Sequence, residues 1–486
     1  MYKTNTLNEQ RAVSLVLLGA LFIRLYALGS ESFWLDEAIV WDRVRGGPLK
    51  FFFDWDADTQ GPIYPMLIWI WSKVFGFGEI SLRVPSAIFG VLSIHALYLL
   101  GRRLFGHTAA IWASVIAAVN PFLLYYSQEA RPYTLWLWAS LLATWYLLRF
   151  MERHSRLNEY GFIGLTLVSL YVHPYGPFLL AIFAAIVVIL HPRSEWSRFK
   201  KSAWTIGIAY LPEAYIFFDT FIGKVKNKWS VAAWIYRPDL TTPWLYMKYY
   251  FSWDVLAAFI SVLLIGGMIA FYRRIRESRK GFVVCWAIIG GLFGLPWLVS
   301  QVTPILWMRY TIIVVAPVTL LAGWSIAQLK RPLQFAAVGL FLMASVYPLY
   351  HYYFGTDKDP WREAVMWLSP KTAPQDRIIV HPLRAPIPFE YYYRDLFDHE
   401  IVIPQDTAKV AEAIPDSGTV WFVTATYSHS KPMREKIYSV LGRTCDCDAT
   451  YKTADLYPRN PFLLFRADVE ITRCVVRQDS AQRTQR

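Results

Sequence analysis

Two adjacent carboxylates, Asp36 and Glu37, are the first residues of this sequence whose types and spacing suit catalytic chemistry. They follow the aromatic and apolar residues 33–35, just after the first long apolar run. A carboxylate pair at the edge of an apolar phase suits proton abstraction, because partial desolvation and a neighbouring like charge make one carboxylate a stronger base. The alternative is a helix that carries acids in its first turn. The residues alone leave both interpretations open, and Asp36 and Glu37 are candidates for a general base.

A second charged cluster, Glu129 and Arg131, follows Tyr126 at the end of another apolar run. The planar guanidinium of an arginine matches the geometry of phosphate oxygens, which makes Arg131 a candidate ligand for an anionic donor. The alternative is an ion pair in which Arg131 only neutralises Glu129. The sequence leaves both open and adds Glu129 to the catalytic candidates.

Three more candidates, His173, Arg309 and Tyr310, stand at the ends of apolar runs. Ionisable groups at such depths are functional-site candidates by default. Their structural alternatives are an arginine that extends its charged end to the membrane surface and a hydrogen-bonded packing histidine. For Arg24, inside an apolar run, we expect the first of these alternatives, a charged end that extends to the membrane surface.

Asp54, Asp56 and Asp58 alternate just before a turn that contains Gln60 and Tyr64. An EF-hand calcium loop is excluded because the glycine and glutamate that it needs are missing. The segment suits either a solvated turn or a site for a cation or for substrate hydroxyls. The sequence contains no P-loop, dinucleotide-binding glycine motif, serine-hydrolase motif or zinc-ligand spacing.

The composition places these residues in a membrane protein. The 486 residues are 55% hydrophobic and 17% charged, with a net charge of +13. Soluble domains are roughly 45–50% apolar and about 25% charged. Lys and Arg cluster in short segments between apolar runs, which is typical of membrane topology and not of a nucleic-acid-binding face. We therefore expect an α-helical polytopic membrane protein with membrane lipids, and no nucleic acid, as partners.

Eleven apolar runs are candidate membrane spans, since about 20 apolar residues cross a bilayer. They are residues 12–28, 82–101, 108–126, 132–150, 160–172, 174–190, 203–219, 253–272, 281–299, 307–328 and 332–350. The two runs beside His173 are short, so residues 160–190 form either a broken hairpin or one kinked helix. Residues 62–76 are too few for a comfortable crossing and predict an interfacial or re-entrant helix in the first outer loop.

The distribution of basic residues predicts the orientation. If residues 62–76 do not cross, the loops that share one side are rich in Lys and Arg, as at residues 102–103, 149–156, 193–201, 273–280 and 330–331. The positive-inside rule makes that side cytoplasmic. The candidate site residues then lie on the outer side, together with a second basic loop at residues 220–252. A catalytic interpretation requires residues 34–37 and 127–131 to share one outer pocket.

After Tyr350 the long apolar runs end, and polar residues and prolines become frequent. Short β-rich runs at residues 377–380, 419–423 and 462–465 alternate with helical stretches such as residues 360–368. This pattern predicts a small extracytoplasmic α/β domain over residues 351–486, after a membrane domain over residues 1–350. Cys445, Cys447 and Cys474 lie close together there, so Cys474 has two candidate disulfide partners.

These motifs resemble the GT-C membrane glycosyltransferases, specifically the bacterial branch related to protein O-mannosyltransferases and lipid A aminoarabinose transferases. The resemblance is carried, in order, by residues 34–38, 61–64, 82–86 with 101–106, 126–133 and 309–310 before Pro317. It implies a sugar donor on polyprenyl phosphate, transfer outside the cytoplasm and inversion at the anomeric carbon. It covers most of residues 12–330.

The resemblance also implies roles for the site residues. Asp36 matches the family's first acid and would be the general base, and Glu129 matches the region of the second acid. Arg131, Arg309 and the basic outer loop would stabilise the leaving phosphate without a nucleotide. We expect Tyr310 to join the phosphate site, and Gln60, Tyr64, Tyr126 and His173 to contact substrate.

The sequence also departs from the family. Relatives that use aminoarabinose carry a Glu-Lys-Pro turn where this chain has Gln60-Gly61-Pro62, so the phosphate-binding lysine and the acid of that turn are absent. This argues against a close aminoarabinose transferase and leaves the sugar open. A divalent metal is also open, because aminoarabinose enzymes bind one and many inverting relatives need none. Residues 359–363 and 391–393 match only loosely and suggest an outer appendage.

We therefore expect a glycosyltransferase of the bacterial inner membrane that acts on a lipid, glycan or protein acceptor outside the cytoplasm. Two other classes fit parts of the pattern. A flippase or exporter of lipid-linked sugars would also place ionisable groups at the interface and lack an ATP motif. An assembly protein would tolerate changes at Asp36 and Glu129.

Overall fold

The structure is a computed structural model that describes residues 2–53, 60–226, 235–356, 358–382, 384–394, 401–404, 406–427, 430–455 and 467–477. These form two compact units. Unit 1 comprises Met1–Leu28 and Arg43–Tyr350, and unit 2 comprises Gly29–Asp42 and His351–Arg486. The acid-bearing segment Gly29–Asp42 thus packs with the C-terminal residues, whereas the sequence analysis grouped it with the membrane domain.

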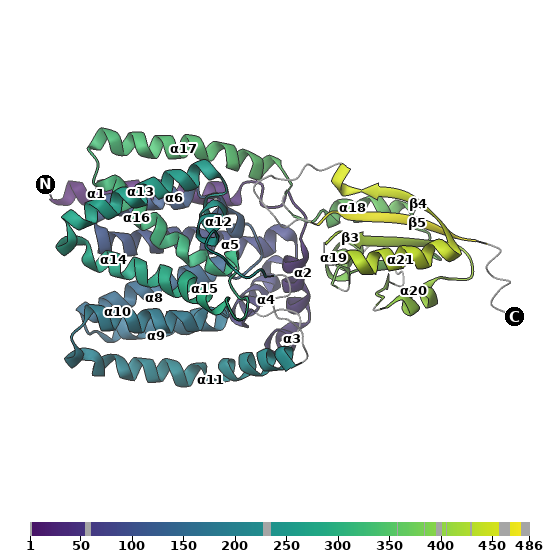
Figure 1. Cartoon of the computed structure of the whole chain (residues 1–486), viewed down its shortest axis with the longest axis horizontal. Coiled ribbons are helices and arrows are strands. Elements are labelled where there is room, and N and C mark those ends of the chain that lie inside the picture. Colours follow the sequence, from purple (N-terminus) through teal and green to yellow (C-terminus); the bar gives the residue numbers. More distant parts are fainter. Residues whose placement is uncertain are drawn as a thin grey trace. The chain divides into compact units, whose positions relative to one another are not determined.

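Unit 1 is helical (Figure 1). Its helices are α1 (Tyr2–Leu25), α3 (Gly47–Phe53), α4 (Ile63–Phe75), α5 (Glu79–Phe105), α6 (His107–Ala118), α7 (Pro121–Ser127), α8 (Tyr133–Glu152), α9 (Arg156–Val172), α10 (Gly176–Leu190), α11 (Trp196–Lys226), α12 (Thr242–Phe251), α13 (Asp254–Arg273), α14 (Ile275–Ile289), α15 (Leu295–Val299), α16 (Val315–Ala327) and α17 (Arg331–Phe354). A π-helical turn covers Gly290–Gly294, and a 3-10 segment covers Met308–Val314. Helix α2 (Leu35–Arg45) begins in the acid-bearing segment.

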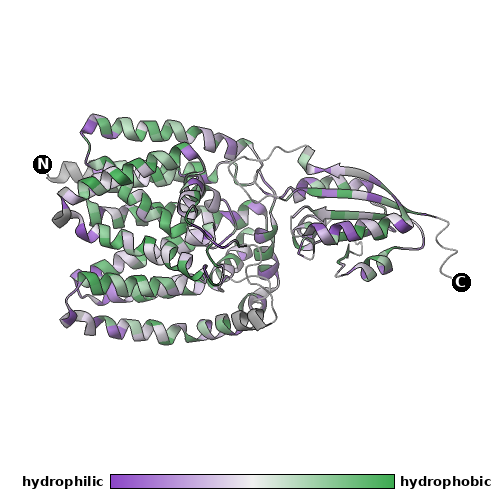
Figure 2. Cartoon of the chain, viewed as in Figure 1, coloured by the Kyte–Doolittle hydropathy of each residue, from purple (hydrophilic) through white to green (hydrophobic). Residues whose placement is uncertain are grey.

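Each of the eleven predicted spans falls on one or more of these helices. Within the described ranges, five helices are long and apolar enough to cross a bilayer, and the bent pair α6–α7 makes a sixth. Hydrophobic residues, coloured green in Figure 2, are frequent along the helices of unit 1. Val262 on α13 and Met343 on α17 are each 68% exposed, as lipid-facing side chains would be. The count of eleven stays a prediction.

Helices α6 and α9 each end shortly before a proline, Pro121 and Pro174 respectively. The residue before a proline is driven away from helical geometry. Asn120 accordingly has ψ 119° before Pro121, and its side chain caps α7 by accepting a hydrogen bond from the Leu123 amide. His173 is extended at φ −143° and ψ 137°, so residues 160–190 form two helices and not one kinked helix. Helix α4 has 13 residues, or roughly 20 Å of rise, which is short of a bilayer.

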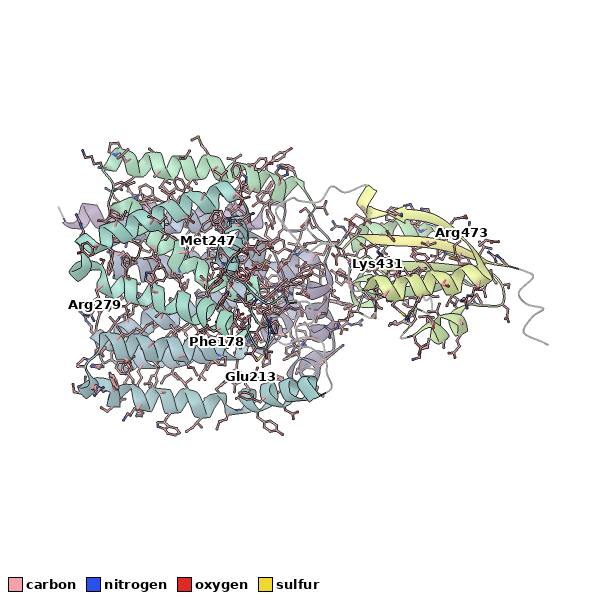
Figure 3. All side chains as sticks on the ribbon, in the orientation of Figure 1. Phe178, Glu213, Met247, Arg279, Lys431 and Arg473 are labelled. Carbon is pink, nitrogen blue, oxygen red and sulfur yellow. A yellow bond between two sulfur atoms is a disulfide. The ribbon has the colours of Figure 1, made fainter. Side chains whose placement is uncertain are left out.

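Three of the predicted inner segments meet at one end of unit 1. Glu152 at the end of α8 forms ion pairs with Arg103 and Lys280, and Arg102 pairs with Glu9 at 3.1 Å. In Figure 3, Arg279 lies at one end of the helices and Phe178 lies toward the other. The ion pairs are consistent with loops that share one membrane side.

Unit 2 contains a five-stranded sheet in the order β2-β1-β3-β5-β4. The strands are β1 (Arg377–His381), β2 (Ile401–Val402), β3 (Thr419–Ala425), β4 (Cys445–Lys452) and β5 (Val469–Val476). Strand β1 pairs in parallel with β2 and β3, and β5 is antiparallel to β3 and β4. The predicted runs 377–380 and 419–423 are strands, whereas residues 462–465 lie outside the described ranges.

Helices cover both faces of this sheet because its central strands are apolar on both faces. Ile378 and Val380 pack with α18 (Trp361–Leu368) and α19 (Pro386–Tyr393). Ile379 points the other way and packs with α20 (Thr407–Ala413) and α21 (Lys431–Thr444). Cys447 and Cys474 lie opposite each other on β4 and β5 and form the disulfide, so the register selects Cys447 over Cys445.

The predicted orientation can be tested by cysteine labelling. In a chain that keeps the disulfide and carries Cys285→Ala and Cys445→Ala, we expect Asp416→Cys to react with a membrane-impermeant maleimide in intact spheroplasts. Ser197→Cys should react only after permeabilisation, because the positive-inside rule places its helix end inside. Both positions are exposed. The reverse pattern would invert the topology.

Candidate active site

The acidic pair lies in the first turn of α2, where negative charge is favourable. Asp36 is partly exposed, whereas Glu37 is fully buried. The Oε2 atom of Glu37 lies 3.0 Å from the Nζ atom of Lys358, whose side chain is 3% exposed. Removal of one partner from a buried ion pair is strongly destabilising, because it leaves an uncompensated charge. Sequence analysis did not identify Lys358.

The charge of Asp36 affects the pKa of Tyr427, a buried tyrosine of unit 2. The hydroxyl of Tyr427 donates a hydrogen bond to the carboxylate of Asp359. Burial is the main cause that raises the pKa of Tyr427 well above its usual value, and the charges of Asp359 and Asp36 raise it further. Tyr427 therefore remains a neutral hydrogen-bond donor at physiological pH.

In unit 1, the segment with Glu129 and Arg131 follows the end of α7, where polar side chains hold it. The side chain of Gln128 donates hydrogen bonds to the Arg24 carbonyl at 3.0 Å and to the Tyr26 carbonyl at 2.8 Å. Arg24 donates to Ser127 Oγ at 3.1 Å and to the carbonyl at the end of α6 at 2.9 Å. Carbonyls at helix ends lack intrahelical partners, so a buried arginine can satisfy them. The expected structural role of Arg24 is consistent with these bonds, but the expectation that its charged end extends to the membrane surface is wrong, because Arg24 is fully buried and hydrogen-bonded inside unit 1.

Arg131 itself is tied to the turn that contains Tyr64. The hydroxyl of Ser86 lies 2.7 Å from the Tyr64 hydroxyl and donates to the Arg131 carbonyl at 3.0 Å. Arg131 is 3% exposed and Glu129 is fully buried. Three predicted residues, Tyr64, Glu129 and Arg131, therefore lie in one hydrogen-bonded region of unit 1.

A continuous series of aromatic contacts joins the two predicted phosphate-binding arginines. The Arg131 guanidinium lies 5.8 Å from the ring of Tyr133, which is 6.0 Å from the ring of His173. His173 is 5.2 Å from Tyr310, and the guanidinium of Arg309 lies 6.0 Å from the Tyr310 ring. The structure thus brings together four residues that the sequence motifs predicted, from three segments that are far apart in the sequence.

Two further aromatic residues complete this series. Trp136 stacks on His173 with a centroid distance of 3.9 Å and an interplanar angle of 12°. Tyr126, a predicted substrate residue, packs 5.0 Å from Tyr133. The stacking on His173 and the edge-to-face contact of Tyr126 with Tyr133, at an interplanar angle of 71°, restrict the orientation of both rings. We call residues Tyr126, Arg131, Tyr133, Trp136, His173, Arg309 and Tyr310 the arginine–aromatic cluster.

The turn at Gln60 is closed by a glycine that tolerates no side chain. A Cβ atom on Gly61 would lie 2.0 Å from the Tyr171 carbonyl oxygen and 3.1 Å from a carboxylate oxygen of Glu213. Arg43 donates to the Gln60 carbonyl at 3.2 Å. Glu213 is 6% exposed and was not among the predicted site residues, although an acid inside an apolar run is a signal for a functional site.

Within the described ranges, no group of three or more His, Cys, Asp or Glu side chains could hold a metal ion. Asp54, Asp56 and Asp58 lie outside these ranges. The common pocket expected for residues 34–37 and 127–131 stays a prediction, since Asp36 belongs to unit 2 and Arg131 to unit 1.

Known proteins with related sequences support the predicted class. The family described as dolichyl-phosphate-mannose-protein mannosyltransferase matches residues 59–215. The undecaprenyl phosphate-alpha-4-amino-4-deoxy-L-arabinose arabinosyl transferase 1 of Pseudomonas fluorescens (strain Pf0-1) is 21% identical over 324 residues, which are 60% of this chain and 54% of that protein. The chain spans about half the length of the curated relatives it matches.

Solved structures share the fold over nearly the whole chain. ArnT from Cupriavidus metallidurans in the apo state has a TM-score of 0.60 at 13% identity, over 94% of this chain and 97% of ArnT. The archaeal oligosaccharyltransferase AglB from Archaeoglobus fulgidus, in complex with an inhibitory peptide and a dolichol-phosphate, has a TM-score of 0.58 at 12% identity, over 90% of this chain and 72% of AglB. The predicted resemblance to the GT-C glycosyltransferases is confirmed.

The close packing at Gly61 gives a stability prediction. Gly61→Ala should destabilise unit 1 by about 1–3 kcal/mol, because the methyl group must displace backbone. Gly78→Ala is the matched control, since a Cβ atom there meets nothing within 4 Å. Thermal unfolding in detergent should show a lower midpoint for Gly61→Ala alone. Equal midpoints for the two variants would contradict the packing argument.

Proposed function

We propose that this protein is a membrane glycosyltransferase that moves a sugar from a polyprenyl-phosphate donor to an acceptor outside the cytoplasm. The arginine–aromatic cluster is the observation that carries the proposal. It combines two cations with rings that present flat apolar surface. A sugar joined through phosphate to a polyprenyl chain offers a monoanionic phosphodiester beside a ring-shaped partner. The structure of ArnT bound to undecaprenyl phosphate, with a TM-score of 0.55 to this chain, supports the choice of donor.

The proposed reaction is a single displacement. Asp36 takes the proton of the acceptor hydroxyl while the acceptor oxygen forms a bond to the anomeric carbon. The bond from that carbon to the phosphate oxygen breaks, and polyprenyl phosphate leaves with the bonding electrons. Arg131 and Arg309 neutralise the negative charge that grows on the phosphate, which lowers the barrier electrostatically. The product is a glycosidic bond of inverted configuration.

The remaining residues have supporting roles in this proposal. Glu129, as a second acid, orients the donor together with Tyr310. Gln60, Tyr64, Tyr126 and His173 contact the sugar. The acceptor is a lipid, glycan or protein, and the enzyme acts in the bacterial inner membrane with its site outside the cytoplasm.

The reaction class can be tested with a radiolabelled polyprenyl-phosphate sugar and membranes that contain the protein. Transfer predicts a labelled product that no longer carries the polyprenyl phosphate. Movement of intact labelled donor across the membrane without a new glycosidic bond would instead identify a transporter.

Asp36→Asn should lower the rate of transfer by at least about 100-fold, because a positioned general base contributes roughly 10²–10⁴-fold. The amide keeps the size of the side chain but cannot accept the proton. Asp416→Asn, an exposed position in unit 2, should leave transfer unchanged. The measurement is the initial rate of label transfer, at equal protein levels. A rate for Asp36→Asn near that of the wild type would remove Asp36 from its role.

Arg131→Ala should raise the apparent KM for the donor about ten-fold, since loss of one phosphate contact costs roughly 1.4 kcal/mol of binding. Arg153→Ala is the control, because Arg153 is exposed and lies in a predicted inner loop. Donor titration at fixed acceptor gives both values. An unchanged donor KM for Arg131→Ala would count against the phosphate role.

A further inference from the structure

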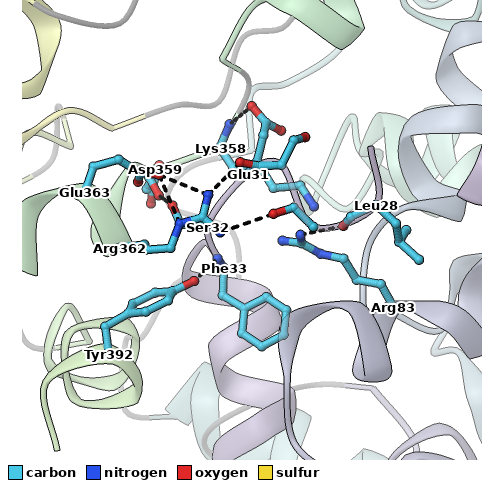
Figure 4. A network of polar contacts seen from close by, with 12 residues as sticks. Leu28, Glu31, Ser32, Phe33, Arg83, Lys358, Asp359, Arg362, Glu363 and Tyr392 are labelled. Carbon is cyan, nitrogen blue, oxygen red and sulfur yellow. Dashed lines mark hydrogen bonds and ion pairs between the residues drawn. The ribbon is translucent and has the colours of Figure 1, made fainter. Parts of the chain in front are cut away.

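The segment Gly29–Asp42 carries the proposed base but has little regular structure before α2 begins at Leu35. Irregular backbone needs hydrogen-bond partners from elsewhere in the fold. Its partners lie in residues 359–363 and 391–393, which the sequence suggested to be parts of an outer appendage, and in the adjoining residues Lys358 and Arg394. Figure 4 shows this network.

The first stretch binds the backbone of the segment. Arg362 donates hydrogen bonds to the carbonyls of Gly29 at 3.2 Å and Ser30 at 2.6 Å. The hydroxyl of Ser32 donates to the carbonyl of Asp359 at 2.7 Å. These three bonds fix three of the four residues 29–32 and lower the number of conformations that the loop can adopt.

The second stretch packs against the aromatic residues that flank the acids in the sequence. The Phe33 amide donates to the Tyr392 hydroxyl at 2.6 Å. The ring of Tyr391 packs 4.9 Å from Phe33 and 5.1 Å from Trp41. The guanidinium of Arg394 lies 4.9 Å from the Trp41 ring. Contacts therefore hold the segment on both sides of Asp36.

The ion pair sets the rotation of α2. Successive residues of an α-helix point about 100° apart, so the direction of Glu37 determines that of Asp36. Lys358 holds Glu37 in the interior, which leaves Asp36 partly exposed. Asp359, the next residue, is itself anchored to the sheet region by bonds from the Tyr427 hydroxyl and from the Ala467 amide at 2.7 Å.

We propose that Lys358 and Arg362 are positioning residues of the transfer reaction, which hold Asp36 toward the acceptor through Glu37 and through the backbone of residues 29–32. This inference rests on the proposed function. It assigns Glu37 to the positioning of α2 and gives unit 2 a part in catalysis.

The test compares Lys358→Met, Glu37→Gln and the double variant in steady-state transfer. Lys358→Met should lower kcat at least about ten-fold with the donor KM unchanged within about two-fold, since the donor contacts lie elsewhere. The double variant should recover to within about three-fold of the wild type, because it leaves no buried charge. Lys436→Met, an exposed lysine on α21, should behave as the wild type.

Hydrogen exchange supplies a readout that does not depend on activity. Amides of residues 32–37 should exchange at least about ten-fold faster in Lys358→Met than in Lys436→Met, while those of β3 keep their protection. Arg362→Gln provides a second variant if Lys358→Met does not accumulate, because the Arg362 side chain is 26% exposed. It should also speed exchange and lower kcat.

Three results would overturn the inference. The first is wild-type kcat and exchange in both Lys358→Met and Arg362→Gln. The second is a faster exchange with no change in kcat. The third is a double variant as inactive as Glu37→Gln, because Glu37 would then act on the substrate itself. Retained transfer in Asp36→Asn would instead refute the proposed function, and the exchange data would still report how the segment is held.

Discussion

The pairing of buried charge is the constraint on which the acid-bearing segment depends. The side chains of Glu37 and Lys358 are both buried, and either charge without the other would add a large desolvation penalty to the free energy of folding. Their ion pair therefore joins a short segment near the N-terminus to a turn that is 321 residues away in the sequence. The loop before α2 has no strand or helix of its own to stabilise it, so its geometry follows from this pair and from the hydrogen bonds of Arg362.

A related requirement, that buried polar groups have partners inside the protein, organises unit 1. Where a proline ends α6, a carbonyl loses its helical partner, and the buried guanidinium of Arg24 satisfies it. Where Pro174 ends α9, His173 is left between helices, and Trp136 stacks on it. The helix breaks thus generate polar backbone and side chains that must be satisfied locally. The arginine–aromatic cluster forms around these breaks, which explains why a region of unusual chemistry exists within an otherwise apolar unit.

Much of the fold could be predicted from the sequence, because span length and proline position are local properties. Each of the eleven apolar runs falls on one or more helices. The break at Pro174 was one of two predicted alternatives, whereas the break at Pro121 divides residues 108–126, which were expected to form one span. The motif residues Arg131, His173, Arg309 and Tyr310 could be grouped because the positive-inside rule places them on one side. The sequence could not predict Lys358, since nothing near it signals a partner as distant as Glu37. Strand register likewise decides between Cys445 and Cys447. The burial of Arg24 depends on a carbonyl of another helix.

Chemical rescue tests the central claim, that Asp36 is the general base, most directly. Asp36→Ala removes the carboxylate and leaves space for a small one, so exogenous formate should accelerate its transfer at least about ten-fold relative to chloride at equal ionic strength. Formate should have no effect on the wild type. Transfer by Asp36→Ala at the wild-type rate without formate, or equal stimulation by formate and chloride, would contradict the account.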